Sequence, residues 1–507
     1  SGEGKGHGCQ RVSWGGGLGG GGGGGAMDDF DCDVLIVGGG PTGVTLASLL
    51  AGRGISVIVA EKETGIFPLP RAAHIDHEGM RILQEAGAAE AVMATSRHTS
   101  RYEFRNANGK VLLCFDGADR IGPGGWPVAN MIHQPSVEAA LRASLAERAP
   151  DALRRGWEMV GFAQDIEGVT ARFATPQDEC SVRARWLVGA DGARSPVRKA
   201  CAIAFEDLGF EEPWLVVDVL VDDPSRLPAA NLQICDPARP TTCVLMGEGR
   251  HRWEFMILPG ESAEAISTPA SVERLLTPWN VAGAVRTERT AVYTFRARIA
   301  EQWRKERVLL AGDAAHQTPP FAGQGLCSGL RDAANLAWKL AESVKGGADA
   351  ALLDTYQPER APNLRATIDM AIMMGRMVCT TSRVGAVVRD AKLGLARMLG
   401  KLPDAPPAYP PLATGAIMSG ASAAGSYFPQ AIASNGARLD DVLGPDMALI
   451  SRSALAEEPL ASYADVLREW LDSHRADAVL IRPDRYVFGA GDAYELKQQW
   501  HTALRAA

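Results

Sequence analysis

One stretch of strand, turn, helix and strand limits the fold of this chain more than any other. The branched apolar run Val34–Val37 leads into a turn with Gly38, Gly40 and Gly43, and a second apolar run ends just before Glu61. Short apolar runs separated by a helical pattern are typical of buried parallel strands. The sequence therefore predicts an α/β fold with a Rossmann-like domain and an interleaved β-sheet substrate domain.

The glycine turn has the spacing of a dinucleotide-binding loop. Gly38 permits the tight turn, Gly40 lets the backbone approach a pyrophosphate, and Gly43 lets helix and strand pack closely. Pro41 and Thr42 would begin the helix, whose N-terminus then faces the phosphates. We expect a dinucleotide here, which the turn alone does not identify as FAD or NAD.

Acidic residues at three strand ends favour FAD. Glu61 is placed to accept hydrogen bonds from ribose hydroxyls, with Lys62 beside it. Asp191 follows the run Leu187–Ala190, and Asp313 follows Val308–Gly312, where ligands of open parallel sheets bind. We predict that Gly312 and Asp313 meet the ribityl chain of a flavin.

A helix is predicted over residues 325–345, and the residues that open it complete the expected cofactor site. Gly323, Gln324, Gly325 and Leu326 would present bare amides and the positive end of the helix dipole. This arrangement stabilises the negative pyrimidine edge of a reduced flavin.

Composition excludes several classes of protein. The 507 residues are 46 % hydrophobic and 22 % charged, with a net charge of −8, so neither a disordered chain nor a nucleic-acid partner is expected. The nine cysteines form no CxxC, which argues against a disulfide scaffold or a thiolate zinc site and suits the cytoplasm. No apolar run reaches about 18 residues, so no membrane contact is expected. No metal is predicted either.

The chain divides into four expected parts. These are a glycine-rich flexible leader at 1–26, an FAD-binding domain at 27–400 with substrate-binding sheet segments at about 90–120 and 205–300, a proline-rich linker at 401–415, and a small α/β domain at 416–507.

Together these motifs resemble the single-component FAD aromatic hydroxylases of the p-hydroxybenzoate hydroxylase type, over about residues 30–400. Further segments resemble 3-(3-hydroxyphenyl)propionate hydroxylases: Pro70–Ala72, Gly125–Pro127, Gln134-Pro135, Trp214–Asp218, Cys235–Pro240, Arg252–Glu261, Gly329–Asp332 and Arg482–Arg485. The resemblance implies hydroxylation of a phenolic acid ortho to its hydroxyl, with bound FAD and with NADH (or NADPH) and O2 as co-substrates. It also implies that the C-terminal domain is thioredoxin-like without a redox pair.

The resemblance assigns roles to individual residues. Arg71 and Gln134 fall on FAD-contacting motifs, and the carbonyl of Pro320 would approach the substrate hydroxyl. Cys327 stands where relatives usually show Asn, at a flavin-facing backbone position.

Catalytic candidates follow from the need to ionise the phenol. Asp76 and His74 lie just after Arg71 and are the candidate groups. A helix N-cap is the alternative for Asp76, and a packing role is the alternative for His74.

Substrate-binding candidates lie in the expected sheet. Arg239 and Arg252 could clamp a substrate carboxylate, and Met246, Trp253 and Phe255 could line an aromatic pocket. A surface or core position is the alternative for each of them.

Two other functions stay open from the sequence. The first is a hydroxylase of polycyclic polyketide phenols, which would share every FAD motif. The second is an FAD-binding protein that does not hydroxylate.

The sequence also leaves open whether the protein forms a homodimer.

Overall fold

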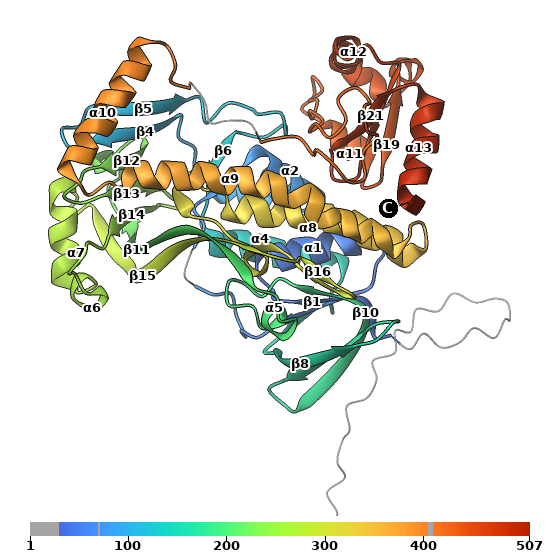
Figure 1. The fold of residues 1–507 in the computed structure, drawn as a ribbon, viewed down its shortest axis with the longest axis horizontal. Coiled ribbons are helices and arrows are strands. Elements are labelled where there is room, and N and C mark those ends of the chain that lie inside the picture. Colours follow the sequence, from blue (N-terminus) through green and yellow to red (C-terminus); the bar gives the residue numbers. More distant parts are fainter. Residues whose placement is uncertain (1–29, 69–70, 404–408, 507) are drawn as a thin grey trace, which may run out of the picture.

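The computed structural model describes residues 30–68, 71–403 and 409–506. The expected leader, Pro70 and residues 404–408 of the expected linker lie outside these described residues. Two eight-stranded sheets and a smaller C-terminal part make up the molecule, and two long helices run across the middle (Figure 1). None of the described helices is long and apolar enough to cross a bilayer.

The first sheet contains the predicted Rossmann-like core. Its strands run in the order β16-β17-β10-β1-β2-β7, with β8 and β9 joined through β10. Their bounds are β1 Cys32–Val37, β2 Val57–Glu61, β7 Leu153–Arg155, β8 Glu158–Gln164, β9 Val169–Ala174, β10 Glu179–Gly189, β16 Arg304–Lys305 and β17 Val308–Leu310. β1 is parallel to β2 and β10, and β10 is parallel to β17, so these four strands end at one edge.

Burial explains why these strands read as continuous apolar runs. Val34, Leu35 and Ile36 are fully buried, because helices cover one face of β1 and other chain segments cover the second. Helix α1, Pro41–Ala51, packs between α8, Gly325–Lys345, and α4, Gln134–Arg148. The expected helix at 325–345 is confirmed at both ends.

The second sheet is mostly antiparallel and has the order β18-β15-β11-β14-β13-β12-β4-β5. Its strands are β4 Arg101–Asn106, β5 Val111–Asp116, β11 Phe205–Val221, β12 Asn231–Cys235, β13 Thr241–Leu245, β14 Arg250–Met256, β15 Val285–Ala300 and β18 His316–Gln317. Helices α6, Ala263–Ile266, and α7, Pro269–Leu276, cover one face. The other face lies toward the segments expected to hold the flavin.

The remaining elements connect the two sheets. They are β3 His74–Asp76, β6 Ala129–Met131, α2 His77–Glu85, α3 Ala89–Thr95, α5 Pro196–Ala200, α9 Tyr356–Val378 and α10 Arg383–Met398. In Figure 1, α8 and α9 run from the second sheet toward the C-terminal part.

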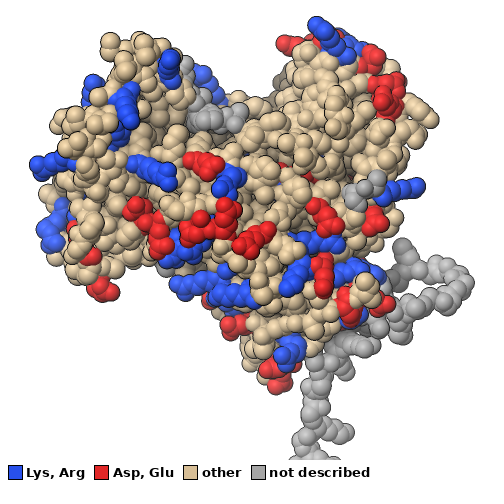
Figure 2. Space-filling view, viewed as in Figure 1, with Lys and Arg blue, Asp and Glu red and all other residues tan. Residues whose placement is uncertain are grey.

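The C-terminal part contains three antiparallel strands, in the order β19-β20-β21, with helices beside them. The bounds are α11 Leu439–Leu443, β19 Ala448–Ser451, α12 Ala464–Ser473, β20 Ala478–Ile481, β21 Val487–Gly491 and α13 Ala493–Ala506. It stands as a separate lobe in the space-filling view, across a notch from the lobe that carries α10 (Figure 2).

Candidate flavin and substrate site

The glycine turn has the geometry that the sequence predicts. Gly38 has a φ of 111°, and a Cβ there would lie 2.3 Å from the Ala190 carbonyl oxygen. A Cβ on Gly43 would lie 2.0 Å from the Gly38 carbonyl oxygen. A Cβ on Gly40 would meet nothing within 4 Å, and α1 begins at Pro41 without a side-chain cap. The helix therefore presents free backbone amides over open space, as a phosphate site requires.

Glu61 supports the same turn from the neighbouring strand. Its carboxylate accepts hydrogen bonds from the amides of Gly39, at 2.7 Å, and Glu63, at 2.8 Å. Each carboxylate oxygen has a second lone pair, so a ribose hydroxyl can still donate to it. Lys62 is largely exposed beside it, near Glu63.

Asp191 and Asp313 lie where the parallel strands end. Oδ2 of Asp191 accepts from the Val197 amide, whereas Oδ1 is buried with no hydrogen-bond partner among the described residues. Asp313 is exposed between buried Gly312 and Ala314, and no described residue bonds to its carboxylate. An orphaned buried acceptor and an exposed acidic side chain at this edge fit the hydroxyl-rich chain of a flavin dinucleotide.

The loop before α8 is shaped by one glycine and left open by another. Gly323 has a φ of 65°, and its carbonyl oxygen lies 3.2 Å from His74 Nδ1. A Cβ on Gly325, the first residue of α8, would meet nothing within 4 Å. Leu326 follows half-buried, and Gln324 Oε1 accepts from Arg331 at 3.2 Å. The start of α8 is thus an uncapped N-terminus over open space, as the sequence predicts.

Asp76 is the N-cap of α2, the alternative that the sequence left open, and its role in ionising the phenol stays a prediction. Oδ1 accepts from the Gly79 amide at 2.8 Å, and Oδ2 pairs with Arg331 at 2.5 Å. Burial alone would raise the pKa of Asp76, but Arg331 and the Gly79 amide help to hold it well below its usual range. A buried carboxylate this stable as an anion is a weak proton acceptor at neutral pH.

His74 and Pro320 shape the loop. Burial lowers the pKa of His74, so the imidazole is neutral at neutral pH and can donate to Gly323. The Pro320 carbonyl accepts the Gly323 amide at 2.8 Å and keeps one lone pair for another donor. The buried thiol of Cys327 lies 3.4 Å from the Asp76 amide.

Gln134 positions the segment that carries Arg71. Its Oε1 accepts from the amides of Arg71, at 3.0 Å, and Ala72, at 2.8 Å, while Nε2 donates to Glu138. The Arg71 side chain itself is exposed. Gln134 therefore acts on the expected cofactor site through the backbone at 71–72.

The two predicted substrate arginines are already paired. Arg252 is buried and binds Asp218 through Nε, at 2.6 Å, and Nη2, at 3.1 Å, while Nη1 donates to the Arg71 carbonyl. Arg239 binds Glu261 through both terminal nitrogens. Each guanidinium already holds a bidentate carboxylate partner, which argues against the prediction that they clamp a substrate carboxylate.

Trp253 and Phe255 are buried in a hydrophobic core, which favours the core alternative for both. They pack in one core with Val272 and Leu276 of α7. Successive strand residues alternate between faces, so Arg252 and Glu254 lie on the side of the Arg71 segment. Met246 is buried just after β13.

Reasoning from the sequence missed a set of polar side chains on the face of the second sheet that carries Arg252 and Glu254, here called the inner face. Thr242 donates to Gln233 at 2.7 Å, Gln233 donates to Tyr102 at 2.7 Å, and Tyr102 donates to the Phe321 carbonyl at 3.3 Å. Glu254 lies opposite Thr242 in the ladder. The alternation of Trp253 and Phe255 with charged residues was the signal that could have revealed this face.

Glu254 is the least compensated member of this group. It is 6 % exposed, no described residue hydrogen-bonds to it, and its nearest cation, Arg252 Nη1, is 3.7 Å away. Burial raises the pKa of Glu254 to about 7, against the opposing effect of Arg252. A buried carboxyl group that titrates near neutral pH is a common feature of active sites.

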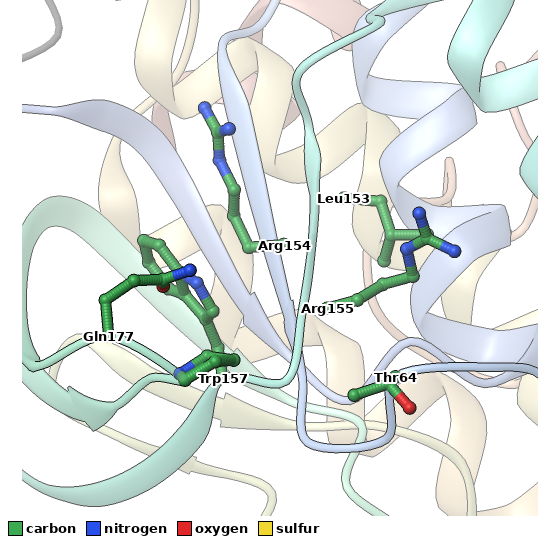
Figure 3. A pocket seen from close by; sticks show the side chains of 7 residues that line it. Thr64, Leu153, Arg154, Arg155, Trp157 and Gln177 are labelled. Carbon is green, nitrogen blue, oxygen red and sulfur yellow. The ribbon is translucent and has the colours of Figure 1, made fainter.

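An open cavity of about 480 Å³ lies near the strand end that carries Glu61 (Figure 3). Thr64, Arg154, Arg155, Trp157 and Gln177 contribute to its lining. Because Arg155 is the ladder partner of Glu61, this cavity adjoins the ribose side of the expected site rather than the loop before α8.

Comparison with known proteins agrees with this geometry. Residues 31–371 match the family described as FAD binding domain, and residues 457–506 match the HcaD C-terminal domain. A probable NADH-specific resorcinol 4-hydroxylase of Rhodococcus jostii (strain RHA1) is 37 % identical, over 92 % of this chain and 93 % of its own length. A 3-(3-hydroxy-phenyl)propionate/3-hydroxycinnamic acid hydroxylase of Burkholderia cenocepacia (strain HI2424) is 37 % identical, over 91 % and 94 %.

Solved structures share the fold. Aklavinone-11 hydroxylase, solved with FAD and aklavinone, aligns with a TM-score of 0.74 at 25 % identity, over 94 % of this chain and all of its own. The flavin-dependent monooxygenase PieE aligns with a TM-score of 0.77 at 24 % identity, over 93 % and 99 %. With its open phosphate turn, acidic strand ends and uncapped α8, the chain belongs to the FAD-binding domain family and is an FAD-dependent aromatic-ring hydroxylase.

Proposed function

We propose that this protein hydroxylates a phenolic acid similar to 3-(3-hydroxyphenyl)propionate, ortho to its hydroxyl group, with NADH or NADPH and O2. One oxygen atom enters the ring, the other leaves as water, and the nicotinamide gives up two electrons. The extended similarity to hydroxylases of this substrate supports the proposal, and the relative described as NADH-specific favours NADH.

The observation that carries the proposal is the uncapped start of α8 facing a polar sheet across the Phe321 segment. Bound FAD supplies the redox chemistry. The protein would hold the cofactor with Asp191, Asp313 and the Gly325 amide.

Glu254 replaces Asp76 as the group proposed to take the phenol proton. A carboxylate with a pKa near 7 is suited to general-base work at neutral pH, and Asp76 is not. The hydrogen-bond chain from Thr242 to Tyr102 would fix the Phe321 carbonyl, next to Pro320.

A neutral diphenol such as resorcinol is the second candidate substrate. Both buried arginines of the inner face, Arg252 and Arg289, lie against Asp218. With Glu254 nearby, this face offers carboxylates that accept hydrogen bonds from hydroxyl groups. Similarity to a resorcinol hydroxylase supports this candidate.

The test is substrate-stimulated NADH oxidation with a panel of phenolic acids, diphenols and polycyclic phenols. We expect slow oxidation alone, strong stimulation by a phenylpropanoid acid, equal O2 uptake and a catechol product. Stimulation by polycyclic phenols alone would overturn the substrate. In Glu254→Gln we expect FAD content to be unchanged and kcat/KM for the phenol to fall at least tenfold, whereas Glu261→Gln, which loses a surface partner of Arg239, serves as the control.

We also propose that the division at 27–400, 401–415 and 416–507 is a division into domains, and that the last is thioredoxin-like and structural. The absence of cysteine after residue 379 supports a role without thiol exchange. A cytoplasmic location is proposed from the low cysteine content.

A further inference from the structure

Helix α10 buries Ala386 and packs Leu393 against the core, but it leaves a second set of apolar residues exposed. Val384, Val388, Leu395 and Met398 are 75 %, 47 %, 57 % and 85 % exposed. With Ala391, which is also exposed, they follow one another at spacings of four, three, four and three residues. Val387 and Leu399, 68 % and 58 % exposed, flank this stripe.

Three polar residues of α10 bond to neighbouring segments, whereas Arg383 and Lys392 are exposed. Arg389 donates to the carbonyls of Met377 and Cys235, and Arg397 donates to the carbonyls of Val111 and Leu112. Asp390 accepts from Asn106 at 2.8 Å. A surface helix normally shows the opposite orientation, with its apolar stripe against the core. These bonds hold the apolar stripe outward.

The position of α10 leaves the stripe accessible. The helix lies at the edge of the molecule beside β4 and β5 (Figure 1). In the same view, uncharged atoms predominate over it, with a few Lys and Arg side chains around them (Figure 2). These six exposed apolar side chains present roughly 600 Å², at the upper end of the roughly 300–600 Å² of the largest apolar patch on a typical monomer. Each partner in a standard interface buries roughly 800 Å².

We propose that a second copy of this chain covers the stripe, with the two α10 helices packed antiparallel across a two-fold axis at Ala391. The spacing of four and three residues is the seam by which one helix packs on another. Val384 and Met398 lie seven residues on either side of Ala391, so the two-fold axis places each against the other. The small Ala391 side chain lets the helices approach at their crossing.

The sequence of α10 favours another helix over a lipid surface as the partner that covers the apolar stripe. Interfacial helices typically anchor through Trp or Phe, and α10 contains no aromatic residue. A bilayer also requires no seam with a regular spacing. The proposal is independent of the substrate and the reaction.

The test measures the mass of the full chain in solution by sedimentation velocity at about 10 µM. We expect a dimer of 53.8 kDa chains. The double variant Val388→Glu/Leu395→Glu should be monomeric, with unchanged FAD content and far-UV circular dichroism, because both side chains are exposed. Val466→Glu, at an exposed apolar position on α12, should remain dimeric.

A cross-link tests the geometry of the interface. Ala391→Cys lies on the proposed axis, so mild oxidation should give a disulfide-linked dimer, whereas Val466→Cys should not. A monomeric wild-type chain, a double variant that stays dimeric, or a dimer that fails to cross-link at residue 391 would each overturn the proposal. Binding of a monomeric chain to anionic phosphatidylserine vesicles would assign the stripe to lipid instead.

Discussion

Asp313 is exposed although the residues on either side of it are buried, so substituting it is the most direct test of the proposed flavin site. Gly312 and Ala314 are buried on either side, and no described residue satisfies the carboxylate. We predict that Asp313→Ala loses most of its FAD, because the carboxylate would contribute one or more charge-assisted hydrogen bonds to the cofactor. Flavin absorbance per chain after gel filtration measures this. Asp369→Ala, another exposed acidic residue, is the control, and equal flavin content in the two variants would refute the assignment.

The raised pKa of Glu254 implies that the free energy of unfolding depends on pH. Its pKa is about 7 in the folded chain and about 4.5 when exposed, so the folded state binds the proton more tightly. The stability contributed by this carboxyl group is therefore complete below about pH 4.5 and is lost as the pH rises to 7. The difference corresponds to roughly 3 kcal/mol. We expect Glu254→Gln to be more stable than the parent at pH 8, with a smaller gain at pH 5. Urea unfolding at both pH values measures this, and a gain that does not grow with pH would contradict it.

At the residue scale, the structure agrees with the expected geometry of the glycine turns and strand ends more closely than with the expected pairing of the substrate residues. Gly38, Gly43 and Asp313 act through the backbone or lie at strand ends, so a local motif places them. Arg252 depends on Asp218, which lies 34 residues away on another strand, and no local pattern reveals that pairing. The face of β14 that meets the site is likewise set by the partner helix α7.

Helices α8 and α9 connect the flavin site to the C-terminal part through a buried ionic group. Glu359 of α9 binds Arg482 at 2.7 Å and Lys339 of α8 at 2.8 Å, and Asp484 binds Arg482 at 2.6 Å. None of these side chains is more than 2 % exposed. Burial lowers the pKa of Lys339 to about 8, although Glu359 opposes this effect.

We predict that Glu359→Ala destabilises the protein by about 3–5 kcal/mol, because it leaves two buried cations without their shared carboxylate. Glu206→Ala removes an exposed partner of Arg365 and should cost under about 1 kcal/mol. Denaturant unfolding of the holoenzyme measures both. Similar losses in the two variants would show that the buried group does not hold the helices to the C-terminal part.

Element boundaries show which patterns can be read from sequence. The start of α8 at Gly325 follows a glycine turn and an apolar stripe, which together specify it locally. The outward orientation of α10 could not be inferred from its sequence, because carbonyl groups of other segments, such as those of Val111 and Cys235, hold its arginines.

The whole molecule depends on its C-terminal part for a share of its core. Trp338 and Leu352 pack with Phe488 and Trp500 in one cluster. We predict that a chain ending at Lys401 has a lower unfolding midpoint and aggregates, since this surface and Glu359 become exposed. Thermal unfolding with light scattering measures the effect. A chain beginning at Met27 is the control, and an unchanged midpoint in the chain ending at Lys401 would show that the C-terminal part is dispensable.

The order of strands in the first sheet has a consequence for biosynthesis. β1 lies between β2, which follows it closely, and β10, which is synthesised more than 140 residues later, and β17 comes later still. A ribosome that has released only the first half of the chain has therefore made the phosphate turn without Asp313 or the start of α8. On the proposed site, translation must pass residue 325 before the nascent chain can retain a flavin, so FAD would bind late in the synthesis of each new chain.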